Sequence, residues 1–378
     1  MKILLTDIYF RKSFDIINIL KLHYHPNCFI YTDTDVTLSS RLKSNLIYGA
    51  KTVHRLRKNN NFKQDLFKIS TLYKDEEIVF IPIEESTTLI FMEFLSDTIR
   101  SHNFKFLLPN SETFLLSRNK EELNIFCEEN QIPSPKYISR ETFNLRTFRF
   151  PIIIKPKHGS GAKGIIYIEN EEGLKGQSID FDNFFVQERL PNSKEVEAGF
   201  YLCDKGEIIS FYSHKRIRTY PETGGVTVFS QSSSSLDIKQ SGETIIQKLN
   251  WSGLLMIEFI FDKRDNTYKL IEINPRLWGS IMLSEFCGAE FLNKYVDISM
   301  GNVFKKSKIS NDIFIRWIFP YDIIYWFKHL SNPFNFFKKR SNTCYINFTY
   351  SNLLKSLIFV SLTYFSFSKI TKLFCNEK

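Results

Sequence analysis

Residues 254–276, LLMIEFIFDKRDNTYKLIEINPR, place three oxygen-bearing side chains where they could bind a metal ion. The pattern predicts two apolar strands joined by a polar turn around Asp265. In a hairpin symmetric about Asp265, Glu258 lies opposite Glu272, and Asn274 points to the same face. Facing carboxylates repel each other, and with an amide oxygen beside them they form a set of hard ligands that suits Mg²⁺. The alternative is the solvent-exposed face of an amphipathic hairpin.

A second stretch, PIIIKPKHGSGAKGIIYI at residues 151–168, could bind a polyphosphate. It predicts a strand at Ile152–Ile154 that ends in Lys155, a glycine-rich loop, and a second strand at Ile165–Ile168. The loop contains Gly159, Ser160, Gly161 and Gly164 together with Lys157 and Lys163. Glycines let backbone N–H groups approach phosphates closely, and a phosphate would pair the otherwise costly charge of Lys155. The loop lacks the spacing and following helix of a P-loop. The alternative is an ordinary hairpin with flexible glycines.

A third stretch is basic. His214, Arg216 and Arg218 alternate along one predicted strand and are followed by a turn at Gly224–Gly225. Three cationic or titratable groups on one strand face suit an anionic carboxylate or phosphate. The alternative is a basic, exposed strand face.

In their order and spacing, the motifs IIIKPKHGSGAKG, VQERLPNSKEVE and MIEFIF…LIEINPR resemble the ATP-grasp superfamily. The resemblance is strongest to the carbamoyl-phosphate-synthetase-like ATP-grasp proteins, and it covers roughly half of the chain from Lys120 onward. It implies that Lys120 and Lys155 contact the α- and β-phosphates of ATP, and that the loop from Gly159 to Gly164 closes over the β/γ-phosphates. The chain departs from the family before Lys120, where Asn119 stands in place of a frequent acidic residue.

The resemblance also implies where the nucleoside binds. Glu188 and the backbone of Leu190 would hold the adenine at a hinge between two lobes, and Glu195 would contact the ribose.

The resemblance further implies a metal site and an acyl site. Glu258, Glu272 and Asn274 would ligate one or two Mg²⁺ ions, with Mn²⁺ as a substitute, and Arg276 would stabilise the transferring phosphoryl group. Arg216, Arg218 and the turn at Thr223–Gly225 lie where such proteins meet the acyl substrate. The family's usual chemistry activates a carboxylate as an acylphosphate, which an amine, thiol or similar nucleophile then attacks.

The elements that must position these residues follow from periodicity. Short apolar runs alternate with helical patterns over residues 1–110 and predict a doubly wound, parallel α/β domain. No glycine fingerprint follows the first strand, which argues against a dinucleotide site. Glu84 and Glu85 follow a central strand, either as substrate contacts or as a solvated helix start. The overall expectation is an α/β protein: residues 111–185 and 186–302 form the small and large lobes of an ATP-grasp domain of α+β type, and residues 303–378 form a helical C-terminal region.

The composition bears on the partners and the location of the protein. The 378 residues carry a net charge of +9, which is spread over the chain. The scattered cysteines, without a CxxC pair, indicate a reducing, cytoplasmic compartment, and no apolar run reaches the roughly 20 residues of a membrane-spanning helix. The aromatic, basic segment after Gly301 either packs on the core as helices or lies peripherally on an anionic membrane surface.

The leading hypothesis is an ATP- and Mg²⁺-dependent carboxylate–amine or carboxylate–thiol ligase. The alternatives are a non-catalytic, ATP-binding regulatory protein and a basic membrane-surface or polyanion-binding protein. Nucleic acid is not an expected partner, because a nucleotide or an acidic substrate explains the charge equally well. The sequence does not identify the carboxylate, the nucleophile or the oligomeric state.

Overall fold

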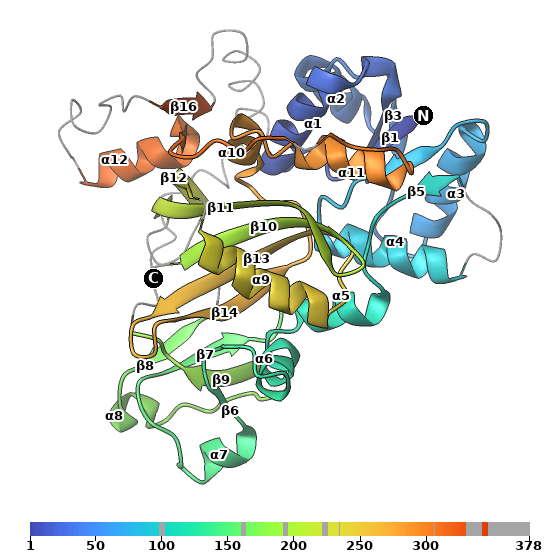
Figure 1. Cartoon of the computed structure of the whole chain (residues 1–378). Coiled ribbons are helices and arrows are strands. Elements are labelled where there is room, and N and C mark those ends of the chain that lie inside the picture. The colour runs from blue at the N-terminus through green and yellow to red at the C-terminus, as the bar shows by residue number, and fades with distance from the viewer. Residues whose placement is uncertain are drawn as a thin grey trace. The chain divides into compact units, whose positions relative to one another are not determined.

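A computed structural model describes residues 1–97, 103–159, 164–191, 196–220, 226–233, 235–305, 307–329 and 342–346 (Figure 1). The chain divides into two compact units. One unit consists of Met1–Phe106, Trp278–Lys308 and Ile313–Lys378, and the other consists of Leu107–Leu277 and Ile309–Asp312. The predicted division into four regions stays a prediction. Ser160, Gly161, Glu195 and the turn at residues 223–225 lie outside the described residues, as do residues 347–378.

The first unit is built on a five-stranded parallel sheet. Its strands are β1 (Lys2–Leu5), β2 (Phe29–Asp33), β3 (Val53–Arg55), β4 (Ile78–Phe80) and β5 (Phe104–Lys105), in the order β3-β2-β1-β4-β5. Its helices include α1 (Arg11–His23), α2 (Leu38–Tyr48), α3 (Phe62–Leu72) and α4 (Glu85–Asp97). All four strand pairs are parallel, so the doubly wound topology expected from the sequence is confirmed. The sequence pattern gives no clear signal for β3, whose residues VHR include one apolar side chain, or for α2, which is largely polar.

Segments from the C-terminal part of the chain complete this unit. Helices α10 (Ile281–Phe286) and α11 (Phe291–Ser299) pack against α1, and the hydroxyl of Tyr295 in α11 donates a hydrogen bond to the carbonyl of Phe80 at 3.0 Å. Strands β15 (Phe314–Trp317) and β16 (Thr343–Ile346) pair in parallel. A π-helical turn at Ile318–Asp322 and helix α12 (Ile323–His329) lie between them in sequence.

The C-terminal region was expected to be helical. In its described part, two strands accompany the helical segments, so that expectation holds only for residues 318–329. No helix in the described ranges has both the length and the hydropathy needed to cross a membrane.

The second unit contains two antiparallel sheets, here called the small and the large lobe. Helices α5 (Ser111–Arg118) and α6 (Lys120–Glu129) lead into an antiparallel sheet of β6 (Tyr137–Ile138), β7 (Ile152–Pro156), β8 (Ile166–Ile168) and β9 (Phe184–Glu188), in the order β6-β9-β7-β8. Two short helices, α7 (Arg140–Asn144) and α8 (Glu171–Leu174), belong to the same lobe. Ile152, Ile154 and Val186 point into its core together with Phe143 and Leu174. Because strand side chains alternate, the residues between them face the other side of this sheet.

The larger lobe is an antiparallel sheet covered by one long helix. Its strands are β10 (Val196–Asp204), β11 (Glu207–Tyr220), β12 (Val226–Ser233), β13 (Gly253–Asp262) and β14 (Thr267–Asn274), in the order β14-β13-β10-β11-β12. Helix α9 (Leu236–Lys248) packs against β10 and β11 (Figure 1).

The contact between α9 and the sheet is close at Tyr201. This buried side chain donates a hydrogen bond from its hydroxyl to the carbonyl of Ile238 at 2.7 Å. A Cβ atom at Gly199 or at Gly242 would overlap the Tyr201 ring. The two glycines therefore make the space that the tyrosine fills.

Gly242→Ala should destabilise the protein, although alanine normally favours a helix interior by about 1 kcal/mol over glycine. The new methyl group would collide with the Tyr201 hydroxyl, and overpacking of a buried site costs about 1–3 kcal/mol. Thermal unfolding measures the effect. The neighbouring Ser241→Ala is the control and should leave the melting temperature unchanged or raised. An increase in melting temperature for Gly242→Ala would contradict the packing described.

Asp15→Asn should make the N-terminal unit more stable at neutral pH. Burial raises the pKa of Asp15 to about 7, and Arg11 offsets this only in part. The folded state therefore holds an extra proton between about pH 4 and pH 7, and stability falls as the pH rises through that window. Asparagine does not titrate, so the variant should gain from nothing below pH 4 to about 4 kcal/mol above pH 7.

Urea unfolding across this pH range gives the measurement. The exposed Asp75→Asn serves as the control, with no change expected. Parallel stability curves for wild type and Asp15→Asn would show that Asp15 is not the titrating group.

Candidate functional site

The acidic hairpin has the register that the sequence predicts. In β13 and β14, Glu258 pairs directly with Glu272, and Met256 pairs with Asn274. The hairpin is not regular beyond this point, because the register shifts between Glu258 and Phe259 and leaves Ile271 as an extra residue. A bulge of this kind changes which face the following side chains occupy. The two carboxylates and the amide nevertheless share one face.

These acids are not on an exposed face. The Glu258 residue is 7% exposed and Asn274 is 5% exposed, so the alternative of a solvated amphipathic face is wrong. Burial, together with the neighbouring Glu272, raises the pKa of Glu258 above its usual range against the opposing effect of Arg216. Burial also acts to raise the pKa of Glu272, but Lys120 and Asn274 outweigh it, and that pKa is lowered. The site thus holds one carboxylate that stays ionised and one that burial favours in its protonated form.

Basic side chains compensate the paired carboxylates. Arg216 forms an ion pair with Glu258, and the Lys120 Nζ lies 3.6 Å from Glu272 Oε2. Asn274 donates to Glu272 at 3.1 Å and accepts from the Arg276 guanidinium at 2.9 Å. These contacts bring together residues from α6, β11 and the hairpin that are far apart in sequence.

The donor set fits a hard divalent cation. In the described part of the chain, no group of three or more His, Cys, Asp or Glu side chains is arranged to hold a metal. Two carboxylates and one amide oxygen, from Glu258, Glu272 and Asn274, nevertheless lie on neighbouring positions of one face. Oxygen ligands in this number leave room for phosphate oxygens and water, which is how Mg²⁺ is usually bound.

Lys155 lies on the small lobe at the edge of the same charged group. It follows the buried run of β7 and, by alternation, faces away from the lobe's hydrophobic core. Burial lowers the pKa of Lys155 to about 8, with Glu272 and Glu258 opposing this and Lys120 adding to it. A buried lysine in this state gains from an anionic ligand, because the ligand would restore its charge.

The glycine loop is described in part. The Lys120 Nζ donates to the Gly159 carbonyl at 2.6 Å, and the Lys120 amide donates to the Lys157 carbonyl at 2.9 Å. Gly159 and Gly164 both have positive φ angles, of 115° and 73°. The start of α6 is thus bonded to the start of the loop. Asn119, which departs from the family pattern, caps α6 by accepting from the amides of Glu121 and Glu122.

The basic strand β11 differs from its prediction. His214 and Arg216 share a face of β11, but the register shifts between Arg216 and Arg218, with Ile217 as the extra residue. The Arg218 guanidinium lies over the Phe229 ring at 5.6 Å, on the opposite face from Arg216. The predicted common face of all three residues is therefore wrong for Arg218, because the bulge at Ile217 interrupts the alternation. Burial and Arg216 lower the pKa of His214 to about 3, so His214 is neutral.

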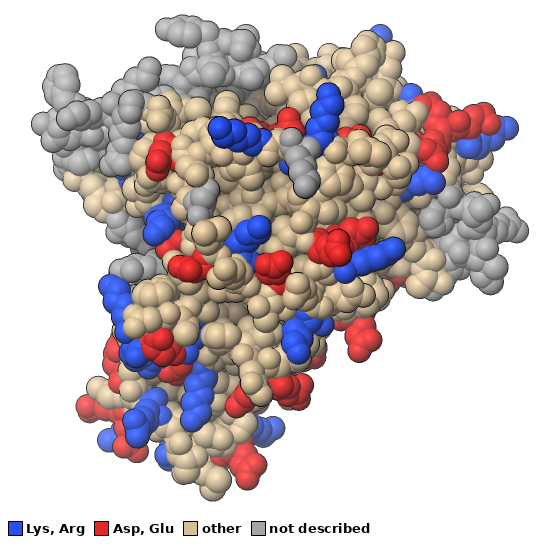
Figure 2. Space-filling view, viewed as in Figure 1, with Lys and Arg blue, Asp and Glu red and all other residues tan. Residues whose placement is uncertain are grey.

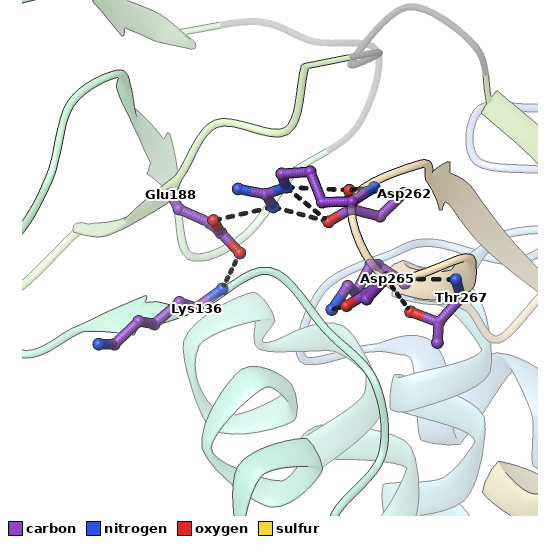
Figure 3. A network of polar contacts seen from close by, with 7 residues as sticks. Lys136, Glu188, Asp262, Asp265 and Thr267 are labelled. Atoms are coloured by element: carbon purple, nitrogen blue, oxygen red, sulfur yellow. Dashed lines mark hydrogen bonds and ion pairs between the residues drawn. The ribbon is translucent and has the colours of Figure 1, made fainter.

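The hinge region contains a charged network around Glu188 (Figure 3). One oxygen of Glu188 accepts from the Lys136 amide at 3.0 Å, and the other accepts from Arg264 at 3.1 Å. The Arg264 guanidinium also donates three hydrogen bonds of 2.6–3.1 Å to Asp262, and these bonds lower the pKa of Asp262. Both oxygens of Glu188 are thus engaged with protein groups. Leu190, two residues later, is buried.

The neighbouring Gln187 is better placed to meet a nucleotide. It pairs with Ile153 in β7, so it shares the sheet face of Lys155, whereas Glu188 lies on the other face. Gln187 is 1% exposed, and its Oε1 has no hydrogen-bond partner among the described residues. The predicted contact of Glu188 with adenine stays a prediction, and this geometry favours Gln187. Counting the strand alternation one residue forward from the core position Val186 in VQERL could have identified Gln187.

Comparison with known proteins identifies the family. Residues 121–306 match the family model "Carbamoyl-phosphate synthase L chain, ATP binding domain". The chain is 22% identical over 210 residues to a carbamoyl-phosphate synthase of Methanobrevibacter smithii, which covers 52% of this chain and 56% of the relative. It also matches plant acetyl-CoA carboxylases, of which it covers 6%. The chain thus spans only part of the length of the relatives that it matches.

Solved structures share the fold. Biotin carboxylase of Campylobacter jejuni aligns with a TM-score of 0.60 at 14% identity, over 82% of this chain and 74% of the other. The biotin carboxylase domain of Hydrogenobacter thermophilus 2-oxoglutarate carboxylase, solved with MgADP and bicarbonate, aligns with a TM-score of 0.59 at 13% identity, over 82% and 72%. The fold is therefore a mixed α/β fold of the ATP-grasp class. With the matching family model, residues 121–306 are identified as a carbamoyl-phosphate-synthase-like ATP-grasp region.

Gln187→Leu should weaken ATP binding about tenfold, because a typical hydrogen bond contributes about 1–1.5 kcal/mol. Glu188→Gln alters a residue whose oxygens already bind Lys136 and Arg264, so it should change the affinity for ATP much less. Titration calorimetry with a non-hydrolysable ATP analogue compares the two variants. A larger loss of affinity for Glu188→Gln than for Gln187→Leu would show that Glu188, and not Gln187, contacts the adenine.

Proposed function

We propose that this protein is an ATP- and Mg²⁺-dependent ligase that activates a carboxylate substrate for attack by an amine or thiol. The observation that carries the proposal is the pairing of the buried Glu258 with the partly buried Glu272, surrounded by Lys120, Arg216 and Arg276. A buried pair of acids is costly to maintain without a ligand that uses it. The relatives support the coarser statement of ATP-dependent carboxylate activation.

Different residues of the site would bind different parts of Mg·ATP. Lys120 and Lys155 would neutralise phosphate oxygens, and the loop that begins at Gly159 would cover them. Glu258, Glu272 and Asn274 would hold Mg²⁺, which when bound supplies positive charge to the phosphates. The Arg276 guanidinium, already fixed by Asn274, would stabilise charge on the transferred phosphoryl group. Catalysis of this kind rests on position and charge and needs no protein nucleophile.

The acyl substrate is proposed to meet Arg216. In the structure its guanidinium pairs with Glu258, so a metal ion on that carboxylate would release it for an anionic group. The bulge turns Arg218 away from this face, which leaves Arg216 as the better-placed arginine of the two. Assays with amines and with thiols distinguish the two kinds of nucleophile.

Glu272→Gln should reduce substrate-dependent ADP release by about 100-fold or more, as losses of charge-positioning groups usually do. The assay is coupled ADP detection with Mg·ATP, across carboxylates paired with amino acids, amines and thiols. The exposed Glu207→Gln on β11 is the matched control and should retain full activity. Turnover that survives Glu272→Gln would contradict the assignment.

A second candidate function is a non-catalytic, ATP-binding regulatory protein. It shares the cleft residues with the ligase but predicts ATP binding without turnover on any substrate pair. A polyanion- or membrane-surface-binding protein is less well supported. On the face that Figure 2 draws, Lys and Arg side chains are interspersed with Asp and Glu rather than gathered into one basic surface. Cytoplasmic location and peripheral membrane contact stay predictions.

A further inference from the structure

The N-terminal unit has a pocket that the ligase chemistry does not use. The pocket has a volume of about 240 Å³ and is lined by residues at the carboxyl ends of β1 and β2, after β3, and in the first turn of α4. The strand order β3-β2-β1-β4-β5 reverses direction between β1 and β4. Ligands of open α/β sheets bind outside the carboxyl ends of the strands at such a reversal. The pocket therefore lies where this fold class binds small molecules.

Three polar groups in the pocket wall have no hydrogen-bond partner within the described ranges of the chain. Thr6 directly follows β1 and Thr87 lies in α4, and each residue is 1% exposed. Among the described residues, neither hydroxyl oxygen has a hydrogen-bond partner, and the same holds for Asp7 Oδ2. Leaving a buried polar group unsatisfied is costly, so folded proteins usually supply a partner or leave it for a ligand. Three such groups around one cavity point to a bound molecule.

The position of Asp7 is fixed by its surroundings. Its side chain is 1% exposed and forms an ion pair with Lys58 through Oδ1, while Oδ2 has no hydrogen-bond partner among the described residues. Its carbonyl accepts from the Ser13 hydroxyl at 2.7 Å, and its φ angle of 56° lies in the left-handed region. The carboxylate is thus held in place by the start of α1 and by Lys58, without the ligand.

The lining determines the chemistry of the ligand. Asp7 and Asp33 provide two carboxylates, Thr6 and Thr87 provide hydroxyls, and Leu56 is among the apolar residues of the wall. The Lys58 ammonium group also lines the pocket and pairs with Asp7, so these charged groups carry one net negative charge. Carboxylates accept hydrogen bonds and repel anions, so the ligand must present O–H or N–H donors. The volume is below the roughly 300–1,000 Å³ of typical drug-sized sites, which limits the ligand to the size of a monosaccharide or an amino compound.

We infer that the N-terminal unit binds a small, donor-rich molecule, a hydroxylated or amino compound, between Asp7, Thr6 and Thr87. This inference does not depend on the ligase function, because every residue that it uses lies within residues 6–87 and none belongs to the proposed ATP site.

The first test needs no ligand. Thr6→Val and Thr87→Val replace an unpartnered buried hydroxyl with a methyl group of the same shape, so each should raise the melting temperature of the ligand-free protein. Thr71→Val is the control, because the exposed Thr71 hydroxyl donates to the Phe67 carbonyl at 2.9 Å, and its loss should not stabilise the fold. A lower melting temperature for both pocket variants would show that the hydroxyls already have structural partners and would overturn the inference.

The second test measures binding with the full chain, in the absence of ATP and Mg²⁺. The probes are D-glucose, D-glucosamine and n-propylamine, and D-glucuronate is the anionic control. Calorimetry or saturation-transfer NMR should detect glucose, propylamine or both at about millimolar dissociation constants. Glucose alone identifies a hydroxylated ligand, and propylamine alone identifies an amino ligand. Glucuronate should bind about tenfold more weakly than glucose, because Asp7 and Asp33 repel it.

Variants test whether the probes bind in this pocket. Asp7→Asn keeps a side chain that tolerates a positive φ angle but replaces one acceptor oxygen with a donor. It should weaken the bound probe about tenfold, as should Thr87→Val, whereas Thr71→Val should have no effect. If no probe binds, or if binding is unchanged in both pocket variants, the inference is wrong. Loss of ATP turnover in Glu272→Gln with probe binding intact would separate this site from the ligase site.

Discussion

The second unit depends on one unfavourable contact, the pairing of two carboxylates across an antiparallel ladder. Glu258 and Glu272 face each other, and burial makes their repulsion stronger than it would be in water. The structure compensates it with Arg216 from β11 and Lys120 from α6. Elements that are remote in sequence are thereby held at one place. The same charges that satisfy the acids are those that a triphosphate and a metal ion would rearrange.

The two β-bulges decide which residues share this site. The bulge at Ile271 falls just beyond the acidic pair, so the pairing of Glu258 with Glu272 is preserved. The bulge at Ile217 falls between Arg216 and Arg218 and separates two arginines that the sequence pattern puts together. One extra residue in a strand is sufficient to remove a side chain from a site or to leave it there.

Much of the fold and of the site could be predicted from the sequence, and the failures have physical causes. Periodicity predicted the parallel sheet, because buried parallel strands appear as continuous apolar runs, and it predicted the hairpin register, because the turn around Asp265 is short. It could not predict bulges, which leave the composition of a strand unchanged. The assignment of Glu188 to the adenine came from the family resemblance, which does not use the strand alternation that puts Gln187 on the sheet face of Lys155. No sequence pattern predicted the pocket of the first unit, because threonines after strands are common.

Arg264 has a mechanical consequence. Its guanidinium binds Asp262 at the end of β13 and also Glu188 at the end of β9 (Figure 3). Asp262 and Glu258 are on the same strand, about 13 Å apart at the usual rise per residue. A rotation of the small-lobe sheet would therefore act, through Arg264, on strand β13. The same strand carries Glu258, an acidic side chain of the charged cluster. Through this one arginine, opening and closing of the lobes would be sensitive to the ionic strength of the solution.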